Sequence, residues 1–225
     1  MGVNLVRFIK DLKSEDIMRV TLVRHGQSKG NFGRFFPNHT TELTDVGHKQ
    51  AKKVMDRLNG SVYDGLFASP LNRALQTAQY LSENLNLPIT QTPLLAELRD
   101  PSMYDGKDYA DEKVAEIKAE IARHVDDMDY HYSDEENYFE FIERGKKLLE
   151  FFDHLPFENI VCVSHGYLIS MITLLVVFAD DLNPSNLYRG MRRMHSYNTA
   201  ISVIEFQEGI WRLYSFGDHA HLLGD

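Results

Sequence analysis

The sequence predicts an α/β fold, a three-layer α/β/α sandwich around a mostly parallel central sheet with an antiparallel C-terminal element. Two apolar segments, residues 18–24 and 159–164, each lead directly into a His-Gly pair. Continuous apolar runs of this length are typical of strands buried in a parallel sheet. Strand and helix patterns alternate between them, as expected for helices on both faces of the sheet.

The N-terminal half alternates between predicted strands and helices. Residues 18–24 form the first strand, and a loop rich in Gly, Phe and Asn follows to about residue 42. Thr44 is a favourable N-cap for the next helix. A short strand is expected at 65–69, where Ser69-Pro70 predicts a capped helix start with proline in the first position. Residues 88–95 predict a third strand. The two helices carry the apolar stripes Ala51, Val54, Met55, Leu58 and Leu71, Ala74, Leu75, Ala78, Leu81.

Residues from about 99 to 135 differ in composition, because they are acidic, rich in tyrosine and poor in glycine. They predict a cap-like insertion over the carboxyl edge of the sheet, with a helix around residues 112–124. A further helix follows Glu135-Glu136, then a strand at 159–164 and an apolar helix at 166–178. A hairpin of residues 200–206 and 210–216, turning at Glu208-Gly209, closes the fold. The inward residues of the helix after Glu136 are expected to be Phe139, Ile142, Leu148, Leu149 and Phe152.

Length and composition favour one domain spanning residues 1–225, with an amphipathic N-terminal extension at 1–17. A chain of 225 residues that is 43% hydrophobic can bury one substantial core. The formal net charge of −9 disfavours non-specific binding to nucleic acid, which depends on clustered Lys and Arg. A phosphate ester would therefore need a locally positive pocket.

The cellular setting is predicted to be the cytoplasm. Cys162 is the only cysteine, so no disulfide can form within the chain. Residues 1–17 lack the apolar stretch of a signal peptide. The apolar helix at 166–178 is shorter than a membrane span, so we expect no membrane partner.

The candidate site lies where two predicted strands end. His25 and His165 follow these strands, and ligands of open α/β sheets bind at the carboxyl ends of strands. A neutral imidazole with one nitrogen held by a hydrogen bond is a competent nucleophile toward phosphorus. Arg24 and Arg73 could supply forked cationic donors that match phosphate oxygens. Together these side chains predict a phosphate site.

Two further features complete the candidate site. The helix that begins at Gly166 would direct its first amides toward a bound anion. Glu97 stands among apolar residues, a setting that suits a general acid donating to a leaving oxygen. Taken singly, each residue has a plainer interpretation: Arg73 could be a solvated surface residue, His165 a core histidine and Glu97 an ordinary strand-end residue.

Five motifs in sequence order resemble those of the histidine phosphatase superfamily, also called the phosphoglycerate mutase-like family. They are RHGQSKGN at 24–31, LTDVGHKQA at 43–51, SPLNRALQTA at 69–78, VSHG at 163–166 and NTA at 198–200. The resemblance implies a phosphoglycerate mutase-like fold and phosphoryl-transfer chemistry without a metal or another cofactor. It also implies that His25 is the phosphorylated nucleophile and Glu97 the proton donor. Arg24, Arg73 and His165 would hold the phosphoryl group, with Asn31 contributing to the pocket.

The departures from the family pattern favour a phosphatase that acts on a small phosphorylated substrate. Long basic segments that would hold the second phosphate of a mutase substrate are not found, although mutase-type transfer stays open as a second function. The chain could also act on a phosphoprotein, or bind ligands without catalysis. Phe35 and Phe36 could wall an apolar entrance or pack on the insertion. Arg99 could contact a second anionic group, or pair with Asp100 or Asp105. The protein is expected to be a monomer or a homodimer.

Overall fold

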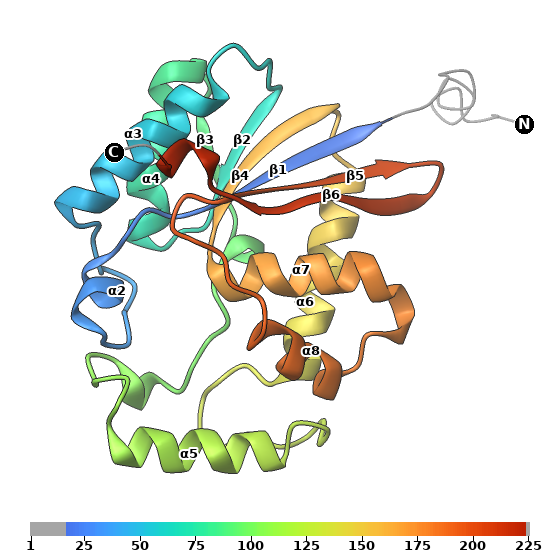
Figure 1. The fold of residues 1–225 in the computed structure, drawn as a ribbon. Coiled ribbons are helices and arrows are strands. Elements are labelled where there is room, and N and C mark those ends of the chain that lie inside the picture. The colour runs from blue at the N-terminus through green and yellow to red at the C-terminus, as the bar shows by residue number, and fades with distance from the viewer. Residues whose placement is uncertain (1–16, 224–225) are drawn as a thin grey trace, which may run out of the picture.

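The computed structural model describes residues 17–223 and contains one six-stranded sheet in the order β3-β2-β4-β1-β5-β6 (Figure 1). Strands β1 and β4 run parallel at its centre, and β5 joins β1 in antiparallel fashion. The strands are β1 (Met18–Arg24), β2 (Gly65–Ala68), β3 (Ile89–Gln91), β4 (Asn159–Ser164), β5 (Ile201–Gln207) and β6 (Ile210–Asp218). The predicted fold class is confirmed. Apart from Ile17, the extension predicted at 1–17 lies outside the described residues.

Helices cover both faces of this sheet, and each face has its own apolar core. Alternate residues of the central strands point to opposite faces, as the pleat requires. Ile160 and Cys162 of β4 pack with α6, α7 and α8, whereas Val161 and Val163 pack with α3 and α4. The helices are α2 (Lys29–Gly33), α3 (Asp45–Leu58), α4 (Asn72–Leu85), α5 (Glu112–Arg123), α6 (Tyr138–Asp153), α7 (Gly166–Phe178) and α8 (Pro184–Met191). Single 3-10 turns are η1 (Pro93–Leu95), η2 (Ser102–Tyr104), η3 (Ala179–Asp181) and η4 (Ala220–Leu222).

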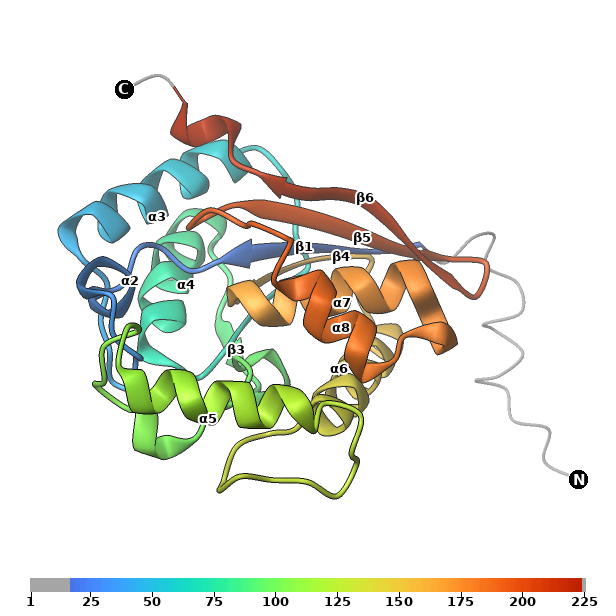
Figure 2. The same ribbon diagram turned by 60° about the horizontal axis from the view of Figure 1, so that its bottom comes forward.

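The insertion lies beyond the carboxyl ends of the central strands, where Figures 1 and 2 show α5 apart from the two helical layers. Its small apolar cluster consists of Val114 and Ile117 of α5, Tyr104 of η2, and Phe36 from the loop after α2. Residues 34–36 and 106–109 are joined by backbone hydrogen bonds of 2.8 to 3.0 Å. The insertion is therefore fastened to the loop that follows α2.

Several elements agree with the sequence in their bounds. Strand β4 and helix α7 occupy residues 159–164 and 166–178, as predicted. Thr44 caps α3 by accepting from the amide of Gly47. The hairpin of β5 and β6 turns at Glu208 and Gly209, whose φ angles of 56° and 77° are those of a type I′ turn.

Other predicted elements differ from the structure. Helix α4 begins at Asn72, so neither Ser69 as a cap nor Pro70 as first helical residue was correct; the Ser69 amide instead bonds to Val163 of β4. The third strand covers only Ile89–Gln91, because Thr92 caps the 3-10 turn η1. In α6 the buried phenylalanines are Phe141 and Phe152, whereas Phe139 is half-buried.

Two helices were not predicted. The short α2 stands where a loop was expected, and its capping box joins Ser28 and Asn31. Helix α8 carries the recognisable signal Asn183-Pro184, an N-cap followed by proline.

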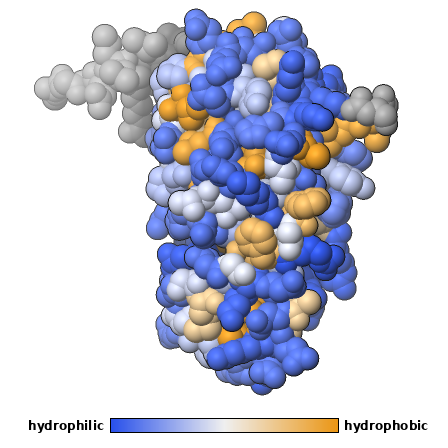
Figure 3. Space-filling view, turned by 90° about the vertical axis from the view of Figure 1, so that its left-hand side faces the viewer, coloured by the Kyte–Doolittle hydropathy of each residue, from blue (hydrophilic) through white to orange (hydrophobic). Residues whose placement is uncertain are grey.

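Among residues 17–223, no helix combines the length and apolar character needed to cross a membrane. Figure 3, which views the molecule from the left of Figure 1, shows a mostly hydrophilic surface with scattered apolar side chains.

Candidate active site

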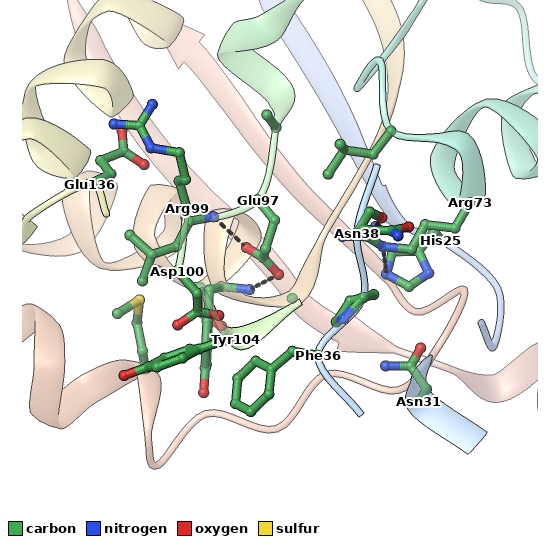
Figure 4. A pocket seen from close by; sticks show the side chains of 18 of the residues that line it. His25, Asn31, Phe36, Asn38, Arg73, Glu97, Arg99, Asp100, Tyr104 and Glu136 are labelled. Atoms are coloured by element: carbon green, nitrogen blue, oxygen red, sulfur yellow. Dashed lines mark hydrogen bonds between the residues drawn. The ribbon is translucent and has the colours of Figure 1, made fainter. Parts of the chain in front are cut away.

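A cavity of about 1030 Å³ opens at the carboxyl ends of β1 and β4 (Figure 4). The pairing of Arg24 with Ser164 in the sheet brings the two His-Gly pairs side by side. The rings of His25 and His165 are 5.1 Å apart between centroids. Six of the predicted site residues line the cavity: Arg24, His25, Asn31, Arg73, Glu97 and Gly166.

His25 is oriented as a nucleophile requires. Its Nδ1 lies 2.7 Å from the carbonyl oxygen of Gly26, which can only accept, so the proton resides on Nδ1. Nε2 then carries the lone pair, and Arg73 donates to it from Nε at 3.3 Å. Burial, followed by the charges of Arg73 and Arg24, holds the pKa of His25 well below its usual range. The imidazole is therefore neutral at neutral pH.

Arg24 and Arg73 bring two positive charges to the same side of the cavity. Arg73 is only 3% exposed and donates from Nη1 to the carbonyl oxygen of Asn38 at 3.3 Å. Arg24 donates from Nη1 to the carbonyl oxygen of Ser196, and its buried Nε has no hydrogen-bond partner. Within residues 17–223 neither guanidinium forms an ion pair with a carboxylate. A buried Arg73 and a half-buried Arg24, neither balanced by a carboxylate, attract an anionic ligand.

His165 is fully buried and is not among the residues that line the cavity. The Ser69 hydroxyl, which accepts from the Leu71 amide, lies 2.7 Å from His165 Nε2. If the hydroxyl donates to Nε2, the remaining proton is on Nδ1, a buried atom without a partner among the described residues. Burial and then Arg73 lower the pKa of His165 well below its usual range, so it is neutral before an anion binds.

Asn31 and Gly166 contribute to the cavity wall through different contacts. Asn31 Oδ1 accepts from the Ser28 amide and from Asn198 Nδ2, each at 3.2 Å. Asn198 also donates to the carbonyl oxygen of His25 at 3.0 Å and so links the loop between α8 and β5 to the nucleophile. Gly166 lies against Arg24, where an added Cβ would be 3.4 Å from the guanidinium Nε.

Glu97 faces the cavity opposite His25 and Arg73 (Figure 4). Its carboxylate accepts from the amides of Leu168 at 3.0 Å, Leu98 at 3.1 Å and Tyr167 at 3.2 Å. The surroundings of this carboxylate are thus more polar than its apolar sequence neighbours predict. The amides of α7 that follow Gly166, expected to face a bound anion, bond to Glu97 instead.

Acid should destabilise the folded protein through the two active-site histidines. Their native pKa values lie below those of the unfolded chain, so the unfolded state binds more protons as the pH falls below about 6.5. For each pH unit of decrease below this value, each histidine should lower the free energy of unfolding by up to about 1.4 kcal/mol. Urea unfolding at pH 7 and at pH 5.5 measures the loss. A His25→Asn/His165→Asn double variant should lose less, and an equal loss would contradict this cause.

Comparison with known proteins identifies the family. Residues 20–219 match the histidine phosphatase superfamily, branch 1. The chain belongs to that superfamily. An uncharacterized phosphatase, PhoE of Bacillus subtilis, is 26% identical over 208 residues, 91% of this chain and 97% of its own. A probable phosphoglycerate mutase, GpmB of Proteus mirabilis, is 25% identical over 217 residues, covering 92% and 95%.

A solved structure supports the same fold. A histidine-to-alanine mutant of phosphoserine phosphatase from Entamoeba histolytica, in complex with phosphoserine, superposes with a TM-score of 0.74 at 24% identity. The match covers 92% of this chain and 100% of that one. The enzyme class predicted from the sequence, a phosphatase of the histidine phosphatase superfamily, is confirmed by the family match and by the named relatives.

Several side chains that serve the site of this histidine phosphatase were not singled out from the sequence. Thr77, which lies within the SPLNRALQTA motif, accepts from the amide of Gly26 at 3.0 Å. Ser69 and Asn198 belong to family motifs as well, which is the signal that could have marked them. Tyr109 of the insertion lines the cavity and packs edge-on against Phe36 at 4.8 Å.

Aromatic side chains and Arg99 surround the cavity mouth. Phe36 is buried; it lines the cavity and also packs on Tyr104 at 5.0 Å, so it both walls the pocket and contacts the insertion. Phe35 is half-buried. Arg99 lines the cavity, but its Nε donates to the carbonyl oxygen of Asp134 at 2.8 Å.

Proposed function

We propose that this protein is a metal-independent phosphomonoesterase that works through a phosphohistidine intermediate on His25, with Glu97 as general acid and base. The observation that carries the proposal is the state of His25, a buried neutral imidazole whose Nδ1 is fixed by Gly26. The Nε2 lone pair accepts from Arg73 in the free protein, and it becomes available to attack phosphorus when that guanidinium turns to the phosphoryl oxygens.

In the first step, Nε2 of His25 attacks phosphorus and the bond to the leaving oxygen breaks. Arg24 and Arg73 stabilise the equatorial phosphoryl oxygens, joined by His165 Nδ1 when the Ser69 hydroxyl donates to Nε2, with Asn31 and Gly166 at the edge of the pocket. Glu97, on the opposite side of the cavity, gives its proton to the departing alkoxide.

In the second step, ionised Glu97 takes a proton from water as the water oxygen attacks the phosphohistidine. The bond between Nε2 and phosphorus breaks, His25 regains its lone pair, and inorganic phosphate leaves. Dividing one difficult displacement into two easier ones is the advantage of covalent catalysis.

The substrate is proposed to be a small phosphorylated molecule. The phosphoserine phosphatase of Entamoeba histolytica binds such a compound, and the two chains share their fold. Mutase-type transfer is the second candidate because one relative is named as a probable phosphoglycerate mutase. A phosphoprotein substrate is the third. Residues 1–225 would form one domain with the insertion at 99–135, working in the cytoplasm as a monomer or a homodimer.

Assays with p-nitrophenyl phosphate and EDTA test this function. We expect turnover that is insensitive to EDTA, together with an acid-labile phosphoryl label on His25 in quenched reactions. Turnover that disappears with EDTA and returns only with added metal would contradict the proposal. Transfer of the label to a second hydroxyl compound, with little phosphate released, would favour the mutase.

Replacing Glu97 by glutamine should affect poor leaving groups most. An alkyl phosphate depends on protonation of its leaving oxygen, so its kcat/KM should fall by about 10²–10⁴-fold, whereas that of p-nitrophenyl phosphate should fall far less. The glutamine keeps the size of the side chain, and its single carbonyl oxygen can still accept from one of the two α7 amides that bind the carboxylate. Equal losses on both substrates would contradict proton donation by Glu97.

A further inference from the structure

Four successive carbonyl oxygens, those of residues 94–97, each accept a hydrogen bond from a side chain. Arg144 of α6 donates to the carbonyls of residues 94, 96 and 97 at 3.1, 2.8 and 3.3 Å. Ser164, the last residue of β4, donates to the carbonyl of residue 95 at 2.7 Å. This segment is neither helix nor ladder strand over its full length, so side chains take the place of regular backbone partners.

The guanidinium of Arg144 is itself fixed by a second residue. Glu136 accepts from Arg144 Nε at 2.7 Å and from Nη2 at 2.8 Å, which is a bidentate ion pair. The two side chains are only 16% and 11% exposed. A forked pair of this kind holds the plane of the guanidinium, and therefore the direction of its other donors.

Glu97 is thus held from both ends. Arg144 binds its carbonyl oxygen and two preceding ones, while the amides of Tyr167 and Leu168 at the start of α7 bind its carboxylate. Glu97 is therefore bound by both α6 and α7. Neither the contacts of its carbonyl oxygen nor those of its carboxylate alone determine the position of the carboxylate in the cavity. General acid catalysis requires hydrogen-bond reach of the leaving oxygen, and a shift of about 1 Å can cost about 100-fold in rate.

We propose that Arg144, oriented by Glu136, is the positioning residue that places Glu97 for proton transfer to the leaving group. The proposal rests on the proposed function, in which Glu97 is the general acid. Arg144 does not touch the reacting atoms in this scheme. Its removal should therefore change how strongly the rate depends on the leaving group, rather than lower every rate by the same factor.

The test is a series of aryl and alkyl phosphates whose leaving groups span a wide range of pKa values. Because kcat/KM reports only the steps up to departure of the leaving group, it isolates the proton donation. In Arg144→Met we expect about a 100-fold loss on alkyl phosphates and less than about a 5-fold loss on p-nitrophenyl phosphate. The plot of log kcat/KM against leaving-group pKa should steepen toward that of Glu97→Gln.

Three further variants separate positioning from simple support of the fold. The double variant Glu97→Gln/Arg144→Met should have the slope of Glu97→Gln alone, because residues that act on one step are not additive. Arg144→Lys keeps the positive charge near His165 but cannot span three carbonyl oxygens, so its slope should be intermediate. Arg19→Met, which removes the Arg–Glu pair between β1 and Glu205 of β5, should leave the slope unchanged.

Each outcome has one meaning. A parallel loss on all substrates in both Arg144 variants, at an unchanged slope, would overturn the positioning role while leaving the proposed function intact. Additive losses in the double variant would overturn it equally. If Glu97→Gln itself fails to steepen the plot, that result would contradict proton donation by Glu97 and, with it, the positioning role of Arg144. A steeper slope in Arg144→Met that the double variant does not exceed supports the proposal.

Discussion

Replacing His25 by alanine should abolish phosphatase turnover, with a loss of at least about 10⁴-fold in kcat. The methyl group cannot attack phosphorus, and no neighbouring group has the same geometry. His165 is buried against Ser69, and its Nε2 lies 2.7 Å from that hydroxyl. The side chain of His25 makes few bonds that hold the fold, since its Nδ1 contact is with the adjacent residue. The variant should therefore fold.

Initial rates with p-nitrophenyl phosphate and acid-quenched phosphoryl labelling measure this loss. His154→Ala is the matched control, because His154 is exposed at the end of α6 and bonds only within its own helix. That variant should keep its rate. Retention of more than about a hundredth of the wild-type rate in a well-folded His25→Ala protein would contradict a phosphohistidine on this residue.

Replacing Arg73 by methionine should lower kcat/KM by about 10³-fold or more without destabilising the protein. A guanidinium that stabilises the transferring phosphoryl group is worth about 10³–10⁵ in rate in other phosphoryl-transfer enzymes. The same guanidinium lowers the stability of the free protein, because it is buried beside Arg24 and its hydrogen bonds go only to a carbonyl oxygen and to His25. Methionine fills a similar volume without a buried charge.

The free energy of unfolding in urea, measured at pH 7 without phosphate, should therefore stay constant or rise by about 1–2 kcal/mol in Arg73→Met. Added phosphate should stabilise the wild-type protein more than the variant, since the anion offsets the buried positive charge. Arg57→Met, which removes an exposed cation paired with Asp218, serves as the control. A loss of about 2 kcal/mol or more in Arg73→Met would instead assign Arg73 to the fold.

Local patterns predicted most of the secondary structure because local forces determine it. Strand β4 is an apolar run that any buried parallel strand would have, and helix α3 begins where Thr44 can cap it. The turn at Glu208 and Gly209 is fixed by the backbone conformations that a short hairpin requires. Errors came where a tertiary contact competed with a local signal. Ser69 has the sequence context of a helix cap, yet its amide donates to Val163 of β4 and its hydroxyl lies against His165.

The candidate site was partly predictable for a similar reason. Two strands that each end in His-Gly place both histidines at one edge of a parallel sheet, whatever the rest of the chain does. Arg73 lies in the first turn of α4 and reaches the same edge. The surroundings of Glu97 were not predictable, since its carboxylate partners on α7 are about 70 residues away in sequence.

By itself, the sequence determined the α/β class, the positions of β1, β4 and α7, and the family to which the chain belongs. These depend on periodicity, capping and short motifs, which act over a few residues. The tertiary structure decided that Arg144 and Ser164 bind the carbonyls of residues 94–97 and that the insertion fastens to residues 34–36. Such contacts join polar groups far apart in the chain, and only the packing of the helices against the sheet determines which of them meet.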